Sequence, residues 1–510
     1  TADSVTTATT DRPALARLLP AALQRGAAGG AATGAPPVAA ASAASAAPAA
    51  TTAPSRFPGL LDLEGRLSRG QAVAVARYLP LGLPHDARDY VNRAVQGGRI
   101  TQASFRVHGD LRDFPSYTRG GEFRIEGQVE DVTLAYVPPA RPGAAPSWPA
   151  FTKLAGGLVF DRIGMQIHKA QARLWGLELS QIDGAIADLD KAELLIGGRV
   201  RGPAADLLRF VRESPLDGWS DGRFRHASAS GNAELKLALR VPAADPEKTR
   251  VDGAVTLAGN DLRLAPQAPL LAATSGRVEF TQDGVNVREA RTTVAGGELR
   301  FAGGTRADGA LRFEGQGTAS AQGLRSAAQE LGGSGSPIAG VLAGSAPYKL
   351  ALGFVAGGHV ELQLASTLAG MALDLPAPFG KSADASLPLL VEQRVTSAAG
   401  AAPRDRLRIE LGTLAQAWWE RALDGSAAPR VLRGAIGVRQ PPPQPGDAGV
   451  RAAAQFDKLD LDAWRALAER LQPAGSSGAA TAAAATDYLP QQIALQAQQL
   501  VVGGRRFSAL

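Results

Sequence analysis

The chain has 510 residues, a formal net charge of +6 and no cysteine, so neither disulfide bonds nor thiolate chemistry can contribute. No stretch approaches the roughly 20 consecutive apolar residues that a membrane-spanning helix requires. Its basic residues are almost all arginines scattered singly along the chain, which favours solvated strand faces over an anion-binding patch, and no nucleic-acid partner is expected. The 59 glycines and 34 prolines favour many short strands joined by turns.

The first 55 residues are predicted to add little to the folded body. Residues 1–26 contain one short helical segment, from Pro13 to Arg25. Residues 27–55 are almost entirely alanine, glycine, proline, serine and threonine, which bury too little apolar area to offset the entropy of ordering, so we expect a disordered insertion. Residues 473–486 have a similar composition and are predicted to be an Ala/Gly-rich linker.

Residues 56–400 alternate between apolar and polar positions with the period of two that is typical of half-buried strands. Within this stretch a hairpin pattern occurs twice at a constant offset of 120 residues, and turns are expected at the glycine pairs 303–304 and 357–358. The first copy contains Phe160, Gly164, Met165, Ile167, Ala170, Gly176 and Leu179, and the second contains Phe280, Gly284, Val285, Val287, Ala290, Gly296 and Leu299.

Four short helices are predicted to interrupt the strands, at about residues 87–95, 203–211, 323–331 and 464–471, from apolar residues at helical spacing. Residues 401–472 form a further repeat with a helix, and residues 487–510 begin another repeat that is cut short. We therefore expect a fragment from the interior of a longer protein. The predicted fold class is all-β: an elongated, curled antiparallel β-sheet groove with a few short flanking helices.

Motifs that could carry chemistry are incomplete. The segment from Phe379 to Ser382 ends like a phosphate-binding loop, but Leu375 occupies the position of the first glycine, and Pro376 and Pro378 remove two amide donors. The five histidines are too dispersed for a metal site, and the Asp188-Leu189-Asp190 run lacks the glycine and glutamate of a calcium loop. No carboxylate pair is singled out for glycoside hydrolysis. We predict no enzyme activity, no catalytic residue, no metal and no cofactor.

Residues 366–383, which include Leu375, Pro376, Pro378, Gly380 and Lys381, resemble a signature of the YhdP proteins, AsmA-like envelope proteins of Gram-negative bacteria. Several weaker matches accompany this segment, and the order and spacing of all the matches extend the resemblance across residues 57–510. The weaker matches are Tyr78-Leu79-Pro80, residues 109–115, Trp148-Pro149, Ser214-Pro215-Leu216 and residues 459–464.

The resemblance implies a bridge-like protein that moves phospholipid from the inner to the outer membrane through a hydrophobic β-groove, supporting outer-membrane lipid homeostasis and the permeability barrier. It also implies a periplasmic location, an inner-membrane anchor outside this fragment, and contacts with both membranes through other parts of the full chain. The expected ligand is the acyl part of phospholipids, and the chain is expected to be monomeric.

Patterning alone leaves two interpretations of the inward apolar residues open: they line a lipid groove, or they pack across a closed sandwich and touch no lipid. The resemblance favours lipid contact. The predicted lining residues are Phe123, Ile125, Leu134, Phe160, Ile167, Leu257, Phe280, Val287, Phe301 and Phe313.

Two other functions remain open at this point. The array could assist the assembly of outer-membrane proteins by offering sheet edges to incoming strands. Alternatively, a β-solenoid enzyme could act on polysaccharide, but this requires clustered carboxylates on an outer face, which the sequence does not show.

Overall fold

The fold is mostly β. The computed structural model contains a large, mixed and largely antiparallel sheet of 25 strands with six short α-helices in the part of the chain that it describes. The predicted fold class is confirmed at this level, whereas the length and curling of the groove stay predictions. The structure describes residues 59–79, 85–114, 120–139, 148–220, 222, 224–242, 244–245, 248–264, 268–330, 340–354, 359–396, 402–423, 429–471 and 487–508.

The chain divides into two compact units, and β11 (Arg250–Arg263) and β12 (Leu271–Thr281) contribute residues to both. The other strands of the first unit are β1 (Leu60–Leu67), β2 (Gly70–Gln71), β3 (Val95–Asp110), β4 (Glu122–Leu134), β5 (Phe151–Asp161), β6 (Gly164–Leu174), β7 (Leu177–Ile186), β8 (Glu193–Pro203) and β10 (Asn232–Pro242). Its α-helices are α2 (Val75–Tyr78), α3 (His85–Ala94), α4 (Ala204–Arg212) and α5 (Leu216–Trp219), and 3₁₀ turns cover Ala72–Ala74 and Leu111–Asp113.

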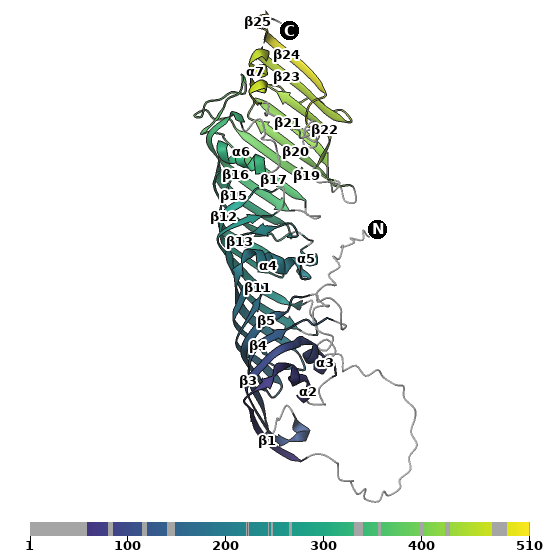
Figure 1. Ribbon diagram of the computed structural model, residues 1–510. Helices are drawn as coiled ribbons and strands as arrows, with labels where there is room; N and C mark the ends of the chain where they lie inside the picture. The colour runs from purple at the N-terminus through teal and green to yellow at the C-terminus, as the bar shows by residue number, and fades with distance from the viewer. Residues whose placement is uncertain are drawn as a thin grey trace, which may run out of the picture. The chain divides into compact units, whose positions relative to one another are not determined.

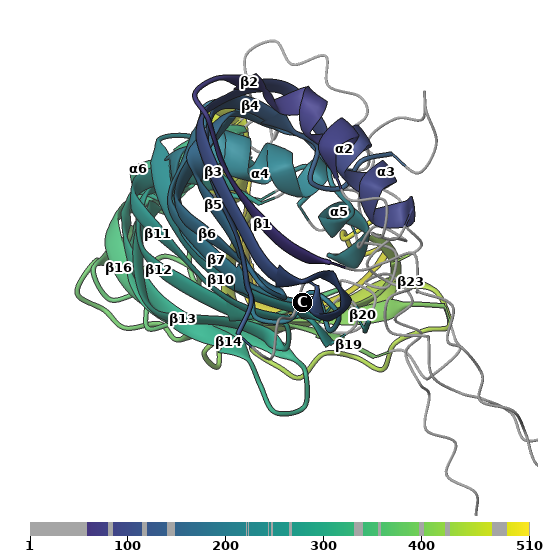
Figure 2. The same cartoon turned by 90° about the horizontal axis from the view of Figure 1, so that it is seen from below.

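In the first unit each strand from β3 to β8 pairs antiparallel with the next strand along the chain. Two-residue turns join β5 to β6 and β6 to β7, because antiparallel neighbours need only a short connection. In Figure 1 these strands follow one another as neighbours, and Figure 2 shows α2, α3, α4 and α5 on one side of them. The helices therefore lie along one end of the strands, where α3 leads into β3 and α4 follows β8.

The second unit contains the remaining strands, and three of them are paired in parallel. Hydrogen bonding is antiparallel from β13 to β22, but β22, β23 and β24 run parallel, and α7 connects β23 to β24. The strands are β9 (Ser228–Ala229), β13 (Gly284–Val294), β14 (Gly297–Thr305), β15 (Leu311–Ser320), β16 (Leu342–Phe354), β17 (Val360–Ser366), β18 (Met371–Leu373), β19 (Leu389–Val395), β20 (Arg404–Leu411), β21 (Ala415–Ala422), β22 (Arg430–Val438), β23 (Gly449–Asp460), β24 (Gln492–Val502) and β25 (Arg505–Ser508), with helices α6 (Ala321–Glu330) and α7 (Leu461–Leu471).

The repeat seen in the sequence extends over four strands and a helix. Strands β5, β6 and β7 begin at residues 151, 164 and 177, and β12, β13 and β14 begin 120 residues later, at 271, 284 and 297. The offset is 118 residues from β8 to β15 and 117 from α4 to α6. The same backbone features recur, since Trp175 and Ala295 both adopt a left-handed conformation, with φ of 52° and 50°, at corresponding hairpin turns.

The predicted helices correspond to α3, α4, α6 and α7, with boundaries shifted by up to a few residues, whereas the turn predicted at Gly303-Gly304 is wrong. Both glycines lie inside β14, where a Cβ on Gly303 would come within 2.9 Å of the Phe313 ring. This glycine pair therefore serves close packing between strands, and the chain turns at residues 306–310 instead.

Several predictions concern residues outside the described part of the chain. These are the helical segment 13–25, the insertion 27–55, the turn at residues 357–358 and the linker 473–486. The domain boundaries proposed from the sequence stay predictions. Among the described residues, no helix combines the length and apolar character needed to cross a bilayer.

Candidate functional site

The first unit carries rows of apolar side chains that run across its strands. Residues paired directly between neighbouring strands project from the same face of a sheet, so the hydrogen-bond register identifies each row. One row passes from β1 to β8 through Gly65, Phe105, Ile125, Phe160, Met165, Ile186 and Leu194. The next row on this face contains Leu67, Ala103, Gly127, Leu158, Ile167, Gly184 and Ile196.

The opposite face of β1, β3 and β4 is charged. Arg106 lies between two glutamates, with its Nη1 2.9 Å from Glu64 Oε2 and its Nε 3.2 Å from Glu122 Oε2. Arg124 Nη1 lies 2.9 Å from Asp161 Oδ2 across the next pair of strands. These exposed pairs add little stability, but they mark this face as the one that is solvated.

In the second unit two apolar rows cross the strands from β13 onward. A single polar residue, Gln393, interrupts the second row, and its amide donates a hydrogen bond to the Val360 carbonyl at 3.3 Å. The first row comprises Ala290, Phe301, Gly315, Leu350, Leu364, Val391, Ile409, Ala417, Ile436, Ala452 and Ile493, and the second comprises Val287, Gly303, Phe313, Leu352, Leu362, Gln393, Leu407, Trp419, Gly434 and Val450. We call the face that carries these rows, in either unit, the apolar face.

The structure brings several of the predicted lining residues together. Ile125 and Phe160 are direct partners, and Phe123 and Ile167 lie in adjacent rows of the same face. In the second unit Val287 and Phe313 share a row through Gly303, and Phe301 lies in the neighbouring row, with its ring 6.5 Å from that of Phe313.

The other three predicted residues are placed less directly. Leu134 lies beyond the bulges of β4, beside Val95 and Phe151. Leu257 is half-buried on β11, and Phe280 is half-buried on β12 with its ring over a glycine of β11. Val287 is fully buried, at 5% exposure, so its side chain is covered in this structure. Whether any of the ten touches lipid stays a prediction.

Glycines lie beneath phenyl rings at two places in the first unit. A Cβ on Gly65 would lie 2.2 Å from the ring of Phe105, and a Cβ on Gly253 would lie 2.2 Å from the ring of Phe280. Contacts this short do not occur between real atoms, so each ring occupies the space that a side chain on the neighbouring strand would fill. Glycine at these two positions therefore lets an aromatic ring lie across the adjacent strand.

A buried ion pair on the apolar face was not anticipated from the sequence. Asp405 is 0% exposed, and its carboxylate receives two hydrogen bonds from Arg421, at 2.8 and 2.5 Å. Burial disfavours the charged guanidinium, but hydrogen bonds with Asp405 and Tyr488 outweigh this effect and raise the pKa of Arg421. The signal was present, because Asp405 is in phase with the inward Leu407 and Ile409.

Tyr488 covers this ion pair. Its hydroxyl accepts a hydrogen bond from Arg421 Nη1 at 3.1 Å, and its carbonyl accepts one from Trp419 Nε1 at 3.2 Å. The Tyr488 and Trp419 rings meet edge to face at 5.7 Å. A polar contact therefore covers the apolar face at one end of β20 and β21. This end is opposite to the end at which α6 and α7 lie.

The signature segment forms a compact loop at the other end of these strands. Backbone hydrogen bonds join Leu373 and Lys381 in both directions, at 2.9 and 3.1 Å, and a Cβ on Gly380 would lie 2.3 Å from the Leu375 carbonyl oxygen. Pro376 accepts a turn hydrogen bond from Phe379, and the Ala377-Pro378 peptide bond is cis. The motif residues therefore shape a tight loop.

Lys381 occupies the position that the lysine has in a phosphate-binding loop, but the loop around it does not form a phosphate site. Its ammonium group donates to the carbonyl oxygens of Leu368, Met371 and Ser382, at 2.8, 2.6 and 2.9 Å. An ammonium group has three donors, and all three are used within the loop. The hydrogen bonds of Lys381 thus stabilise the loop.

The signature loop also contacts both α7 and the residue before β16. Asp374 receives a hydrogen bond from Arg470 of α7 at 2.9 Å, and its backbone N–H donates to the Val341 carbonyl at 2.9 Å. The ring of Phe379 meets Trp464 at 5.9 Å and packs on a buried cluster of β23 and β24. The loop therefore covers the apolar face at the helix-bearing end of the second unit.

Among the described residues, no group of three or more metal-binding side chains is found. Asp188 accepts a hydrogen bond from the Asp190 backbone and pairs with Lys191, which accounts for this motif as a turn between β7 and β8.

Comparison with known proteins identifies the family. The YhdP protein family matches residues 36–510. The intermembrane phospholipid transporter YhdP of Escherichia coli strain K12 is 24% identical over 458 residues, which are 85% of this chain and 32% of that protein, so the chain spans about a third of its relative's length. No solved structure matches significantly. The chain belongs to the YhdP family.

Proposed function

We propose that this chain is a section of a conduit that carries phospholipid from the inner to the outer membrane, with acyl chains held against the apolar face. The observation that carries the proposal is the register, which lines up apolar residues across eleven strands, from Ala290 on β13 to Ile493 on β24. The Escherichia coli relative, described as an intermembrane phospholipid transporter, supports the same cargo.

Hydrophobic transfer explains how such a face holds lipid. Each buried methylene contributes about 0.8 kcal/mol, so a fully buried chain of about 16 carbons would be held by more than about 10 kcal/mol. Transport then requires that contacts are exchanged along the rows without release of the chain into water. Rows made of aliphatic and aromatic groups permit this exchange because they offer no specific site that traps the cargo.

The cellular setting follows from this role. The chain acts in the periplasm as a non-enzymatic monomer and supports the lipid balance and permeability barrier of the outer membrane. An inner-membrane anchor and the contacts with both membranes belong to other parts of the full-length protein. The charged face, exemplified by Arg106 and Arg124, meets water along the conduit.

Photo-crosslinking in cells tests the proposal. A photoreactive phenylalanine analogue replaces Phe280 or Phe313, and matched controls carry it at the adjacent outward positions Glu279 and Glu314. We expect phospholipid adducts, detected by mass spectrometry, from the two phenylalanine positions and several-fold fewer from the two glutamate positions.

Other outcomes contradict the conduit. Protein adducts at both members of each pair would favour the alternative function, an assembly factor for outer-membrane proteins. In that case proline substitutions on edge strands would abolish function, while polar substitutions such as Leu350→Gln would be tolerated. A conduit shows the reverse sensitivity.

A further inference from the structure

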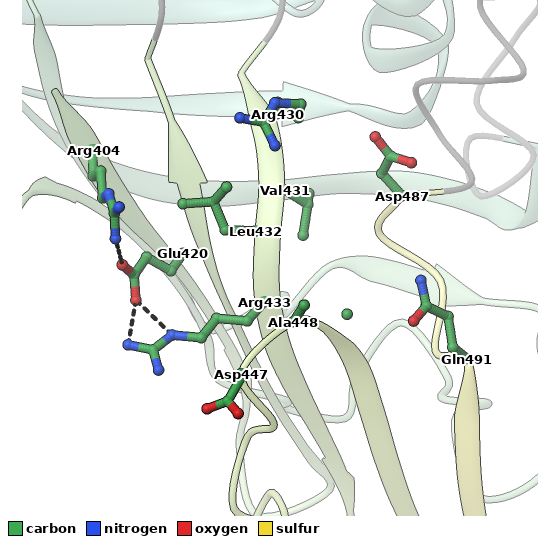
Figure 3. Close-up of a pocket in the computed structure, with 11 residues that line it drawn as sticks. Arg404, Glu420, Arg430, Val431, Leu432, Arg433, Asp447, Ala448, Asp487 and Gln491 are labelled. Atoms are coloured by element: carbon green, nitrogen blue, oxygen red, sulfur yellow. Dashed lines mark hydrogen bonds and ion pairs between the residues drawn. The ribbon is translucent and has the colours of Figure 1, made fainter. Parts of the chain in front are cut away.

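A pocket of about 660 Å³ opens in the second unit, where β20 and β22 begin and β21 ends (Figure 3). Its volume is in the range of ordinary small-molecule sites. In Figure 3, Arg430 and Val431 lie on one strand, and Asp487 and Gln491 lie on the segment facing it. The lining residues are Arg404, Glu420, Arg430, Val431, Leu432, Arg433, Asp447, Ala448, Gly449, Asp487 and Gln491.

The pocket exists because two parallel strands start at different points. β22 begins at Arg430, but the first residue of β23, Gly449, pairs with Arg433, so no residue of β23 lies beside residues 430–432. Leu432 is also the extra residue of a bulge opposite β21. The segment before β24 passes alongside this gap and is fixed by the hydrogen bond from the Gln491 backbone to the Val450 carbonyl, at 2.9 Å.

The lining combines three guanidinium groups with three carboxylates. Glu420 holds two of the arginines in place, with Oε1 3.0 Å from Arg404 Nη1 and Oε2 2.8 Å from Arg433 Nε. Burial opposes the charge on Glu420, but these hydrogen bonds outweigh it and lower the pKa of its carboxyl. The formal charge of the pocket is therefore balanced.

The pocket also adjoins the apolar face. Asp487 lines the pocket, and the next residue, Tyr488, lies against Trp419 on the apolar face. Val431 lines the pocket and pairs with Arg421, which is buried on that face. In the same register Glu420 and Arg433 alternate with Trp419 and Arg421, so their side chains project from the opposite face of the sheet. Val431 and Asp487 mark the edge at which the pocket meets the apolar face, and an amphiphile on that face would place its polar head in the pocket over this edge.

We propose that this pocket binds a headgroup that carries both a phosphate and a primary ammonium, as in phosphoethanolamine lipids. Guanidinium groups bind phosphate through paired, charge-assisted hydrogen bonds, and carboxylates accept the donors of a primary ammonium. A quaternary ammonium is recognised by aromatic rings, which the described lining residues do not include. This inference rests on the proposed function for the lipid itself, while the headgroup chemistry rests on the pocket alone.

Water-soluble headgroups test the pocket without acyl chains. The chain is titrated by calorimetry with glycerophosphoethanolamine, glycerophosphocholine, glycerophosphoglycerol and inorganic phosphate. We expect glycerophosphoethanolamine to bind at least about tenfold more tightly than the other three. Arg430→Gln and Asp487→Asn should each weaken it about tenfold, whereas the controls Arg408→Gln and Asp457→Asn, which lie on strands but outside the pocket, should leave it unchanged. Circular dichroism establishes that all four variants are folded.

Each alternative result overturns the inference. Equal binding of glycerophosphoglycerol or inorganic phosphate would show a plain anion site, equal binding of glycerophosphocholine would exclude recognition of the primary ammonium, and no binding would exclude a headgroup site. The conduit is tested separately by the crosslinks from Phe280 and Phe313. Lipid adducts without headgroup binding would contradict only the proposed headgroup site. Headgroup binding without lipid adducts would contradict only the proposed conduit.

Discussion

Tyr136 follows β4, and its hydroxyl is buried without a hydrogen-bond partner among the described residues. Its ring stacks on Phe151 at 4.6 Å and lies 6.0 Å from Trp148, and its carbonyl accepts a hydrogen bond from the Tyr90 hydroxyl at 3.0 Å. Burial of an unpaired hydroxyl costs free energy that a phenyl ring does not cost. The ring of Tyr136 therefore contributes packing, whereas its hydroxyl lowers stability.

We predict that Tyr136→Phe raises the free energy of unfolding by about 1 kcal/mol, measured by urea denaturation. Tyr90→Phe is the matched control and should lower it by a similar amount, since it removes the hydrogen bond to the Tyr136 carbonyl. Destabilisation by Tyr136→Phe would show that its hydroxyl has a partner.

The same burial gives an alkaline dependence. Burial raises the pKa of Tyr136 above the unfolded value of about 10, so above that pH the phenol ionises in the unfolded chain but not in the folded chain, and the unsubstituted chain loses stability as the pH rises further. The stability difference between Tyr136→Phe and the unsubstituted chain should therefore widen above about pH 10.

Residue-level prediction from sequence succeeded where alternation was regular. Ile125, Phe160 and Ile167 lie on one face as expected, because they belong to stretches without bulges, where period-two patterning fixes the face. Asp405 and Arg421 were missed because each charge looks unfavourable at an inward position until its partner on the next strand is known. Only the register between β20 and β21 shows that the two charges meet.

At the scale of elements, the contact between β11 and β12 depends on Gly253 beneath Phe280. We predict that Gly253→Val displaces the Phe280 ring and lowers the free energy of unfolding by about 1–3 kcal/mol through overpacking. Phe280→Ala in the same chain should recover part of the loss, and the double-mutant cycle in thermal denaturation should give a coupling of at least about 0.5 kcal/mol. Strictly additive effects would contradict the contact.

Two helices are linked to neighbouring hairpin turns by hydrogen bonds that a carboxylate of the helix accepts. Asp206 of α4 accepts a hydrogen bond from the Gly176 backbone at the β6–β7 turn, at 3.1 Å, and Asp462 of α7 accepts from Gly503 and Gly504 at the β24–β25 turn, at 2.8 and 2.9 Å. These bonds lower the pKa of Asp462. The sequence indicated the helices and the glycines separately, but their connection requires the fold.

At the scale of the whole molecule, the repeat predicts where the chain can be shortened. Deletion of residues 204–320 removes one complete repeat and joins Pro203 to Ala321, so that α6 follows β8 as α4 does now. We expect this variant to remain folded, with unchanged ellipticity per residue, because repeat proteins are stabilised mainly by neighbouring units.

The control for this prediction removes half a repeat, residues 204–262, and would join β8 to the last residue of β11. Gel filtration should show aggregation of this half-repeat variant only. Equal loss of structure in both deletions would contradict a modular repeat.

Whole-molecule features were only partly accessible from sequence. The 120-residue offset of the hairpins was visible because Phe160 and Phe280 begin matching patterns, and the structure extends it to α4 and α6. The parallel pairing of β22, β23 and β24 was not predicted, because an apolar run in the sequence does not indicate whether the neighbouring strand is parallel or antiparallel. The pocket at β22 arises from that parallel start and was missed for the same reason.

The cross-strand register also limits how this chain can change in evolution. One residue inserted within a strand would send the rest of that strand to the opposite face and interrupt the rows. Insertions are therefore tolerable only where strands end, as at the signature loop after β17 and the proline-containing connection after β22. Families of such chains should diverge in loop length and number of repeats while the length of each strand drifts little.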